Sequence, residues 1–249
     1  MEGPTPVSSL LHAATMVTAG VFLLLRCSPI FQYAPFILVM VTLIGGSTAF
    51  FFALVAVFQY DIKKVIAYST CSQLGYMFLA CGLSNYALAA FHLFNHAFFK
   101  ALLFLGAGAV IHSFYDEQDM RKMGNAISAL PFTYLAMLIG SIAILGLPFL
   151  SGFYSKDLLL ELAFLRFTVD SSFVYFLAVT AAFLTAIYSL RLLLLVFLKN
   201  YFSFTNSYRL AVLIEVPPFM YFSLLLLSLS SILSGYLFSE LFTGLGNFY

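Results

Sequence analysis

Seven apolar runs, each long enough to cross a lipid bilayer, constrain what this sequence can fold into. A helix needs about 20 apolar residues to span the hydrocarbon core. The runs lie near residues 5–26, 36–59, 65–83, 87–113, 130–167, 172–199 and 217–240. They are too long for strands and lack the alternating pattern of a membrane barrel. We predict an all-α integral membrane protein with about seven transmembrane helices, built as one domain over residues 1–240 with a short tail at 241–249.

The charge content agrees with lipid as the main surroundings of the chain. Of the 249 residues, 8% are charged and 63% are hydrophobic, whereas about a quarter of a soluble domain is charged. The net charge of +1 supplies no basic surface, so nucleic acid is not an expected partner. Cys27, Cys71 and Cys81 show no CxxC spacing, and we expect small apolar residues in helices with no disulfide and no metal site.

The fifth run is too long for one crossing. Residues 130–167 would form a helix of about 57 Å, roughly twice the length needed. Its middle contains Gly146, Pro148 and Gly152, which interrupt or loosen a helix. Either two helices meet at a short turn, or one span is broken near 145–157. We favour the broken span, which lipid tolerates only where protein or a wet cavity satisfies the freed backbone groups.

Basic residues in the connections give the chain an orientation. One set of connections carries six of them, and the opposite set carries two. The first set is Lys63, Lys64, Arg121, Lys122, Lys199 and Arg209, and the second is Arg26 and Arg166. The positive-inside rule places the first set on the cytoplasmic or matrix side.

The fourth run carries a row of titratable residues, His92, His96 and Lys100, spaced four apart. On a helix this spacing puts them along one face. Titratable groups persist inside a membrane where they line water or have partners. Histidine changes charge near neutral pH, and a desolvated lysine releases its proton more readily. The row predicts proton transfer. The alternatives are a zinc site, which lacks the usual additional ligands, and a purely structural polar face.

Other charged residues stand at informative places. His12 lies in the middle of the first run, as either a satisfied core histidine or a proton-carrying group. Lys156 and Asp157 follow the break of the fifth run, and the apolar flanks favour a position at depth over an interfacial helix end. Asp61 and Lys63, between the second and third runs, have the position of an ordinary charge cluster at the membrane edge.

Several motifs together resemble one family. They are GPTPVS at 3–8, LHAATMVTAG at 11–20, DIKK at 61–64, YSTCSQLG at 68–75, HAFFK at 96–100 and FYSKD at 153–157. Taken together, they are similar to the largest antiporter-like membrane subunit of respiratory complex I, NADH:ubiquinone oxidoreductase. The resemblance runs from about residue 2 to residue 240 and implies an antiporter-like helix repeat.

The resemblance also implies roles for single residues along a central hydrated axis. His12 would be a connecting residue, and His92, His96 and Lys100 would form the relay, with Lys100 as its central lysine. Two pairs complete the assignment: Lys156 and Asp157 at the exit side, and Asp61 and Lys63 as a charged element at the edge of the antiporter core.

The resemblance further implies partners and a location. Full-length members have about sixteen spans, and this chain matches them from the eighth onward. It has no counterpart of their earlier glutamate–lysine pair or of their long lateral helix. We therefore expect a split subunit in the mitochondrial inner membrane, or alternatively in a bacterial plasma membrane. Its partners would be other membrane-arm subunits, a separate chain with the N-terminal spans, and another with the lateral helix.

Three functions are left open at this point. The first is a proton-translocating subunit of a redox-driven translocase. No redox chemistry would occur in this chain, and the flavin, iron–sulfur clusters and quinone would reside in partner subunits. The second is a subunit of a cation/proton antiporter, and the third is a structural remnant that braces the complex.

Overall fold

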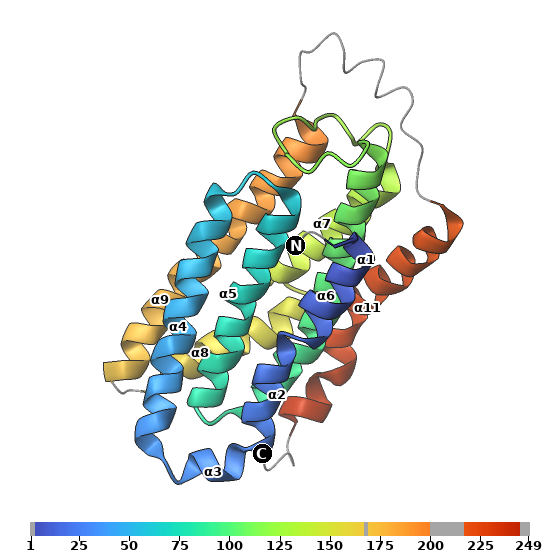
Figure 1. The fold of residues 1–249 in the computed structure, drawn as a ribbon. Helices are drawn as coiled ribbons and strands as arrows, with labels where there is room; N and C mark the ends of the chain where they lie inside the picture. Colours follow the sequence, from blue (N-terminus) through green and yellow to red (C-terminus); the bar gives the residue numbers. More distant parts are fainter. Residues whose placement is uncertain (1–2, 167–168, 200–216, 245–249) are drawn as a thin grey trace.

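The computed structural model describes residues 3–166, 169–199 and 217–244, with the side chains of residues 12–14, 169 and 170 outside the described part. Every regular element within these residues is a helix, and Figure 1 shows the long ones running side by side. The elements are α1 (Thr5–Val7), η1 (Ser8–Thr15), α2 (Thr18–Arg26), α3 (Ser28–Gln32), α4 (Pro35–Phe58), α5 (Ile62–Gly82), α6 (Tyr86–Ser113), α7 (Pro131–Leu145), η2 (Phe153–Asp157), α8 (Leu158–Leu165), α9 (Val169–Leu193), η3 (Leu194–Leu198) and α11 (Pro218–Thr243).

The helices coincide with the seven apolar runs, so the all-α membrane fold is confirmed. The first run is divided into α1, the π-helical segment η1 and α2. Within the described residues, four helices are each long and apolar enough to cross a membrane: Pro35–Phe58, Tyr86–Ser113, Ser171–Leu198 and Pro218–Thr243. The last of these continues three residues beyond the predicted end at 240.

The fifth run is a single broken span, as predicted. Helix α7 ends at Leu145, and Gly146 follows with a φ of 85°, a left-handed conformation that suits glycine. The chain becomes helical again shortly after Pro148, and η2 begins at Phe153. The 15 residues of α7 cover about 22 Å, and the 13 residues of η2 and α8 cover about 20 Å. Neither piece reaches across a core of about 30 Å by itself.

Local sequence explains where several helices begin. Proline occupies the first position of α4, α7 and α11, where its missing N–H costs no helical hydrogen bond. Helix α6 begins after Asn85, whose side chain accepts a hydrogen bond from the backbone N–H of Leu88 at 3.2 Å.

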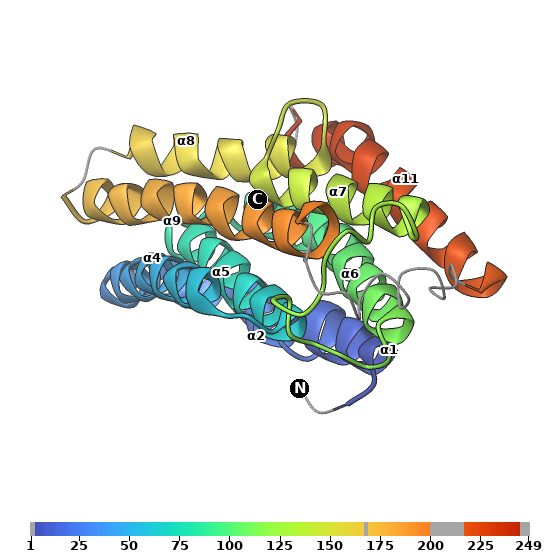
Figure 2. The same ribbon diagram turned by 90° about the horizontal axis from the view of Figure 1, so that it is seen from above.

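Helix α6 lies at the centre of the bundle. It contacts α5, α7, α11 and η1, and Figure 2 shows it enclosed between them. Helices α4 and α5 approach closely because glycines line their contact: a Cβ at Gly75 would lie only 2.6 Å from the Ala49 nitrogen. The central position of α6 encloses its polar row.

Candidate functional site

The polar row of α6 lies in the interior of the protein. The side chains of His92, His96 and Lys100 are at most 1% exposed. The ring centroids of His92 and His96 are 6.4 Å apart, as neighbours one turn apart on a helix should be. Residues four apart thus form one continuous titratable face, which is covered by α5 and by the two pieces of the broken span.

Lys100 is held by a neutral oxygen of α5. Its ammonium Nζ donates a hydrogen bond to Ser69 Oγ. The Ser69 hydroxyl in turn donates to the carbonyl oxygen of Ile66 at 2.8 Å. The Ser69 hydroxyl therefore donates its proton within α5, and its oxygen accepts the hydrogen bond from Lys100.

His92 joins α5 to the broken span. Its Nε2 lies 3.2 Å from Gln73 Oε1, and its Nδ1 lies 2.9 Å from Ser155 Oγ. An amide oxygen only accepts, so Nε2 carries a proton and donates it. In the neutral ring Nδ1 accepts from the Ser155 hydroxyl. That hydroxyl also has the Ser151 carbonyl oxygen at 3.3 Å, so it has two acceptors to choose between.

Lys156 lies in the π-helical turn η2, immediately after the break, and is almost fully buried. Its Nζ donates to Thr185 Oγ1 at 3.1 Å and to the Ile144 carbonyl oxygen at 3.2 Å. The Ile144 carbonyl is free because the residue four positions on is Pro148, which has no N–H. The ammonium also lies 5.4 Å from the centre of the Tyr76 ring. The break therefore creates the acceptor that holds this lysine.

Neither Lys100 nor Lys156 forms an ion pair with a carboxylate among the residues that the structure describes. The described ion pairs, Asp61–Lys64, Asp119–Arg121 and Glu117–Lys122, all lie at one end of the bundle. Lys100 and Lys156 are surrounded by hydroxyl and carbonyl oxygens instead. An uncompensated buried charge costs several kcal/mol, of order 3–5.

Several buried polar atoms around this row have no hydrogen-bond partner in the described part of the chain. They are both ring nitrogens of His96, Gln73 Nε2, Ser151 Oγ and the Tyr188 hydroxyl. Buried polar groups are normally satisfied by protein or by ordered water. The cluster is therefore suited to bind water, whereas no group of three or more His, Cys, Asp or Glu in the described residues is arranged to hold a metal.

The remaining predicted residues lie apart from this row. Asp157 is half-buried and lines a separate cavity of about 250 Å³ together with Glu161 and Tyr175. Lys156 and Asp157 thus have different surroundings although they are adjacent in the chain. The backbone of His12 belongs to the π-helical segment η1, but its side chain lies outside the described part.

Asp61 and Lys63 do not pair with each other. Asp61 Oδ2 lies 2.8 Å from Lys64 Nζ. Lys63 is buried, and its Nζ lies 3.4 Å from the Gly3 carbonyl oxygen. Asp61 forms an isolated bridge with Asp119 of the connection between α6 and α7. The two residues stand at the end of the bundle, but Lys63 is more enclosed than a membrane-edge cluster requires.

The connection between α6 and α7 carries the ion pairs Asp119–Arg121 and Glu117–Lys122. A hydrogen bond from Arg121 lowers the pKa of Asp119, and one from Lys122 lowers the pKa of Glu117. The partners are more than half exposed, so each pair adds little stability.

Comparison with known proteins adds the family. A model described as "NADH:quinone oxidoreductase/Mrp antiporter, TM" matches residues 1–185, well over half of the chain. The chain belongs to this family. It is 59% identical to NADH-ubiquinone oxidoreductase chain 5 of Acanthamoeba castellanii and 56% identical to that of Marchantia polymorpha. Each match covers 99% of this chain but 36% of the relative. The structure of the Mrp complex from Dietzia sp. DQ12-45-1b matches with a TM-score of 0.80 and 29% identity, over 98% of this chain and 27% of the other.

The residues that contact the buried side chains of His92 and Lys100 were not predicted from the sequence. Ser69 and Gln73 of α5 and Ser155 of η2 contact Lys100 and His92. A signal was present, because a polar run that includes a glutamine is unusual inside an apolar span. Thr185 gave no such signal, since a hydroxyl in a membrane helix commonly bonds its own backbone.

Proposed function

We propose that this chain forms part of the proton-translocating machinery in the membrane arm of a redox-driven NADH:ubiquinone oxidoreductase. The observation that carries the proposal is the interior row of His92, His96 and Lys100, with Lys156 packed beside it. Four titratable side chains buried without an ion pair to a carboxylate in the described residues are expensive to keep. Proton movement is a function that requires them there.

The two lysines would be the groups that respond to a driving charge. Each is held by neutral oxygens only, so the charged form of each depends strongly on nearby charge. A charge change in a neighbouring subunit would shift the proton balance of Lys100, because Coulomb energies are large at low dielectric. Protonation of Lys156 would follow when Lys100 releases its proton.

His92 is built to take up a proton without losing a hydrogen bond. When Nδ1 becomes protonated, it donates to Ser155 Oγ, and the Ser155 hydroxyl turns to the Ser151 carbonyl oxygen. The contact from Nε2 to Gln73 is unchanged. Rotation of a single hydroxyl therefore accompanies the charge change, which keeps the cost of reorganisation low.

Water would complete the connections between these groups. The unpartnered nitrogens of His96 lie between His92 and Lys100 on the same helix face. Waters bonded to them would link the row into one axis. In the proposed assembly, His12 would continue the axis toward another part of the membrane arm, and Asp157 would receive protons on the side of its cavity.

The proposal assigns the redox steps to other chains. Flavin, iron–sulfur clusters and quinone would be bound by partner subunits in the mitochondrial inner membrane, and this chain would act as a translocase component. The chain spans 36% of the relatives' length. A complete proton path would therefore use partner spans, supplied by a chain with the earlier spans and by one with the lateral helix.

Replacement of Lys100 by alanine in the assembled complex tests the proposal. Reconstituted into proteoliposomes, the Lys100→Ala complex should translocate fewer protons for each NADH oxidised. Lys122→Ala removes an exposed lysine from the connection between α6 and α7 and should leave the ratio unchanged. An unchanged ratio in Lys100→Ala would contradict the proposal and would favour a role in bracing the complex.

A second candidate is a subunit of a cation/proton antiporter, favoured by the match to the Mrp complex structure. The two functions differ in what drives transport. An antiporter would exchange sodium or potassium for protons in vesicles without NADH. The leading proposal expects no such exchange above the level of protein-free vesicles.

A further inference from the structure

Tyr188 of α9 carries a buried hydroxyl that makes no hydrogen bond of ordinary geometry within the described residues. Its side chain is 3% exposed. The hydroxyl faces Ser69, Ser72 and Gln73 of α5, without hydrogen bonds of ordinary geometry to them. An unsatisfied buried hydroxyl costs about 1–3 kcal/mol. A phenylalanine would avoid that cost, so the hydroxyl calls for another explanation.

The surroundings of Tyr188 connect the two buried lysines. On one side is Ser69, which accepts the hydrogen bond from Lys100. On the other is Thr185, which accepts from Lys156 and precedes Tyr188 by three residues on α9. Residues three apart on a helix lie on the same face. Tyr188 therefore stands between the groups that hold the two amines.

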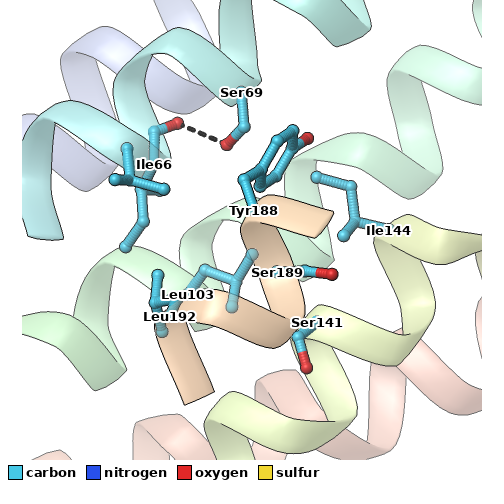
Figure 3. A pocket seen from close by; sticks show the side chains of 9 residues that line it. Ile66, Ser69, Leu103, Ser141, Ile144, Tyr188, Ser189 and Leu192 are labelled. Carbon is cyan, nitrogen blue, oxygen red and sulfur yellow. Dashed lines mark hydrogen bonds between the residues drawn. The ribbon is translucent and has the colours of Figure 1, made fainter. Parts of the chain in front are cut away.

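A small void of about 10 Å³ adjoins Tyr188. Figure 3 shows Ser69 and Tyr188 among the side chains that line it, together with Ile66, Leu103, Ile144 and Leu192. Its surface is almost entirely apolar, so the void offers a water molecule few hydrogen-bond partners. A proton route through Tyr188 therefore depends on side-chain hydroxyls and not on a water in this void.

Tyr76, the other buried tyrosine of this region, already uses its hydroxyl in a hydrogen bond. Tyr76 donates its hydroxyl proton to the Ala178 carbonyl oxygen at 2.8 Å and presents its ring to Lys156. Its hydroxyl is fixed by that bond, whereas no such bond to a backbone carbonyl in the described residues holds the Tyr188 hydroxyl. Of the two, Tyr188 can both accept and pass on a proton.

We infer that the hydroxyl of Tyr188 is a relay through which a proton passes between Lys100 and Lys156. The inference rests on the proposed proton-translocating function. The ammonium of Lys100 loses one proton, the hydroxyls of Ser69, Tyr188 and Thr185 each accept one and release one, and the neutral amine of Lys156 gains one. No other reactant is consumed.

Tyr188→Phe in the assembled complex tests the relay, because it keeps the ring and removes only the hydroxyl. NADH-driven proton pumping in proteoliposomes should slow about tenfold, the lower range for loss of a proton-transferring group. Oxidation of NADH by an artificial acceptor that bypasses the membrane arm should not change. The solvent isotope effect on pumping should increase, which a purely structural defect would not produce.

A matched control is Tyr86→Phe, which also removes a buried, unpartnered hydroxyl but lies at the first residue of α6. It should pump at the wild-type rate. Wild-type pumping by Tyr188→Phe alongside loss in Lys100→Ala would overturn the relay and leave the proposed function standing. Wild-type pumping by both variants would overturn the proposed function as well.

Discussion

At the scale of single residues, Asn95 and His96 show that burial alone does not define a role. Both are fully buried and adjacent on α6. The amide of Asn95 donates to the Ser151 carbonyl oxygen at 3.2 Å and accepts from Ser234 Oγ at 3.0 Å. Both ring nitrogens of His96 lack a hydrogen-bond partner among the residues that the structure describes. Asn95 ties the broken span to α11, whereas His96 contributes no bond that holds the fold together.

These two neighbours should respond differently to the same substitution. Asn95→Leu leaves the buried Ser151 carbonyl oxygen and the buried Ser234 hydroxyl without their hydrogen-bond partner. It should lower the free energy of unfolding by about 1–3 kcal/mol. His96→Leu removes a group without protein partners and should change it by less than about 1 kcal/mol while slowing proton transfer. Thermal unfolding of the assembled complex in nanodiscs measures both. Equal destabilisation by the two variants would show that His96 is held by groups other than water.

The sequence predicted the row at this scale but not its partners. The four-residue spacing of His92, His96 and Lys100 fixes their common face whatever the neighbours are. Ser69 and Ser155 come from other helices, and helix periodicity carries no information about which helix lies opposite. By contrast, the ion pair of Asp61 with Lys64 follows from their three-residue spacing at the start of α5.

At the scale of elements, the break in the fifth span was predictable because length and composition agree. A run of this length with glycines and Pro148 in the middle cannot be one regular helix. The π-helical turn η2 was not predictable, since its geometry follows from tertiary contacts of Lys156 more than from intrinsic preference. That turn directs Lys156 back to the carbonyl that the break has freed.

The close contact at the break should not tolerate a side chain at Gly152. A Cβ there would overlap the Ala143 carbonyl oxygen, so Gly152→Ala must push η2 away from the end of α7. We expect a loss of about 1–3 kcal/mol in unfolding free energy and slower proton pumping. Gly20→Ala is the matched control, because its nearest neighbour, Phe78 Cζ, lies at an ordinary 3.7 Å. Equal effects in both variants would exclude a specific role for this contact.

At the scale of the whole molecule, the described charge pairs gather at one end of the bundle. The connection between α6 and α7 holds most of them, and the opposite end carries Arg26 and α3 (Figure 1). The row of buried titratable groups lies between these two ends. This asymmetry could be read from the sequence because basic residues in loops set orientation independently of how the helices pack.

Accessibility of single cysteines from either side of the membrane tests this orientation. In a Cys27→Ser background, Ser128→Cys places a thiol in the exposed connection between α6 and α7, and Tyr33→Cys places one at the exposed end of α3. A membrane-impermeant maleimide should label position 128 from the matrix or cytoplasmic side only, and position 33 from the opposite side only, because the two ends are separated by the full bilayer. Mass spectrometry of mitoplasts and of inverted membrane vesicles gives the two readings. The inverse pattern would reverse the orientation and with it the side toward which Asp157 faces. Labelling of both positions from one side would mean that the chain crosses the membrane an even number of times between them, contrary to the three crossings that the sequence predicts for α4, α5 and α6.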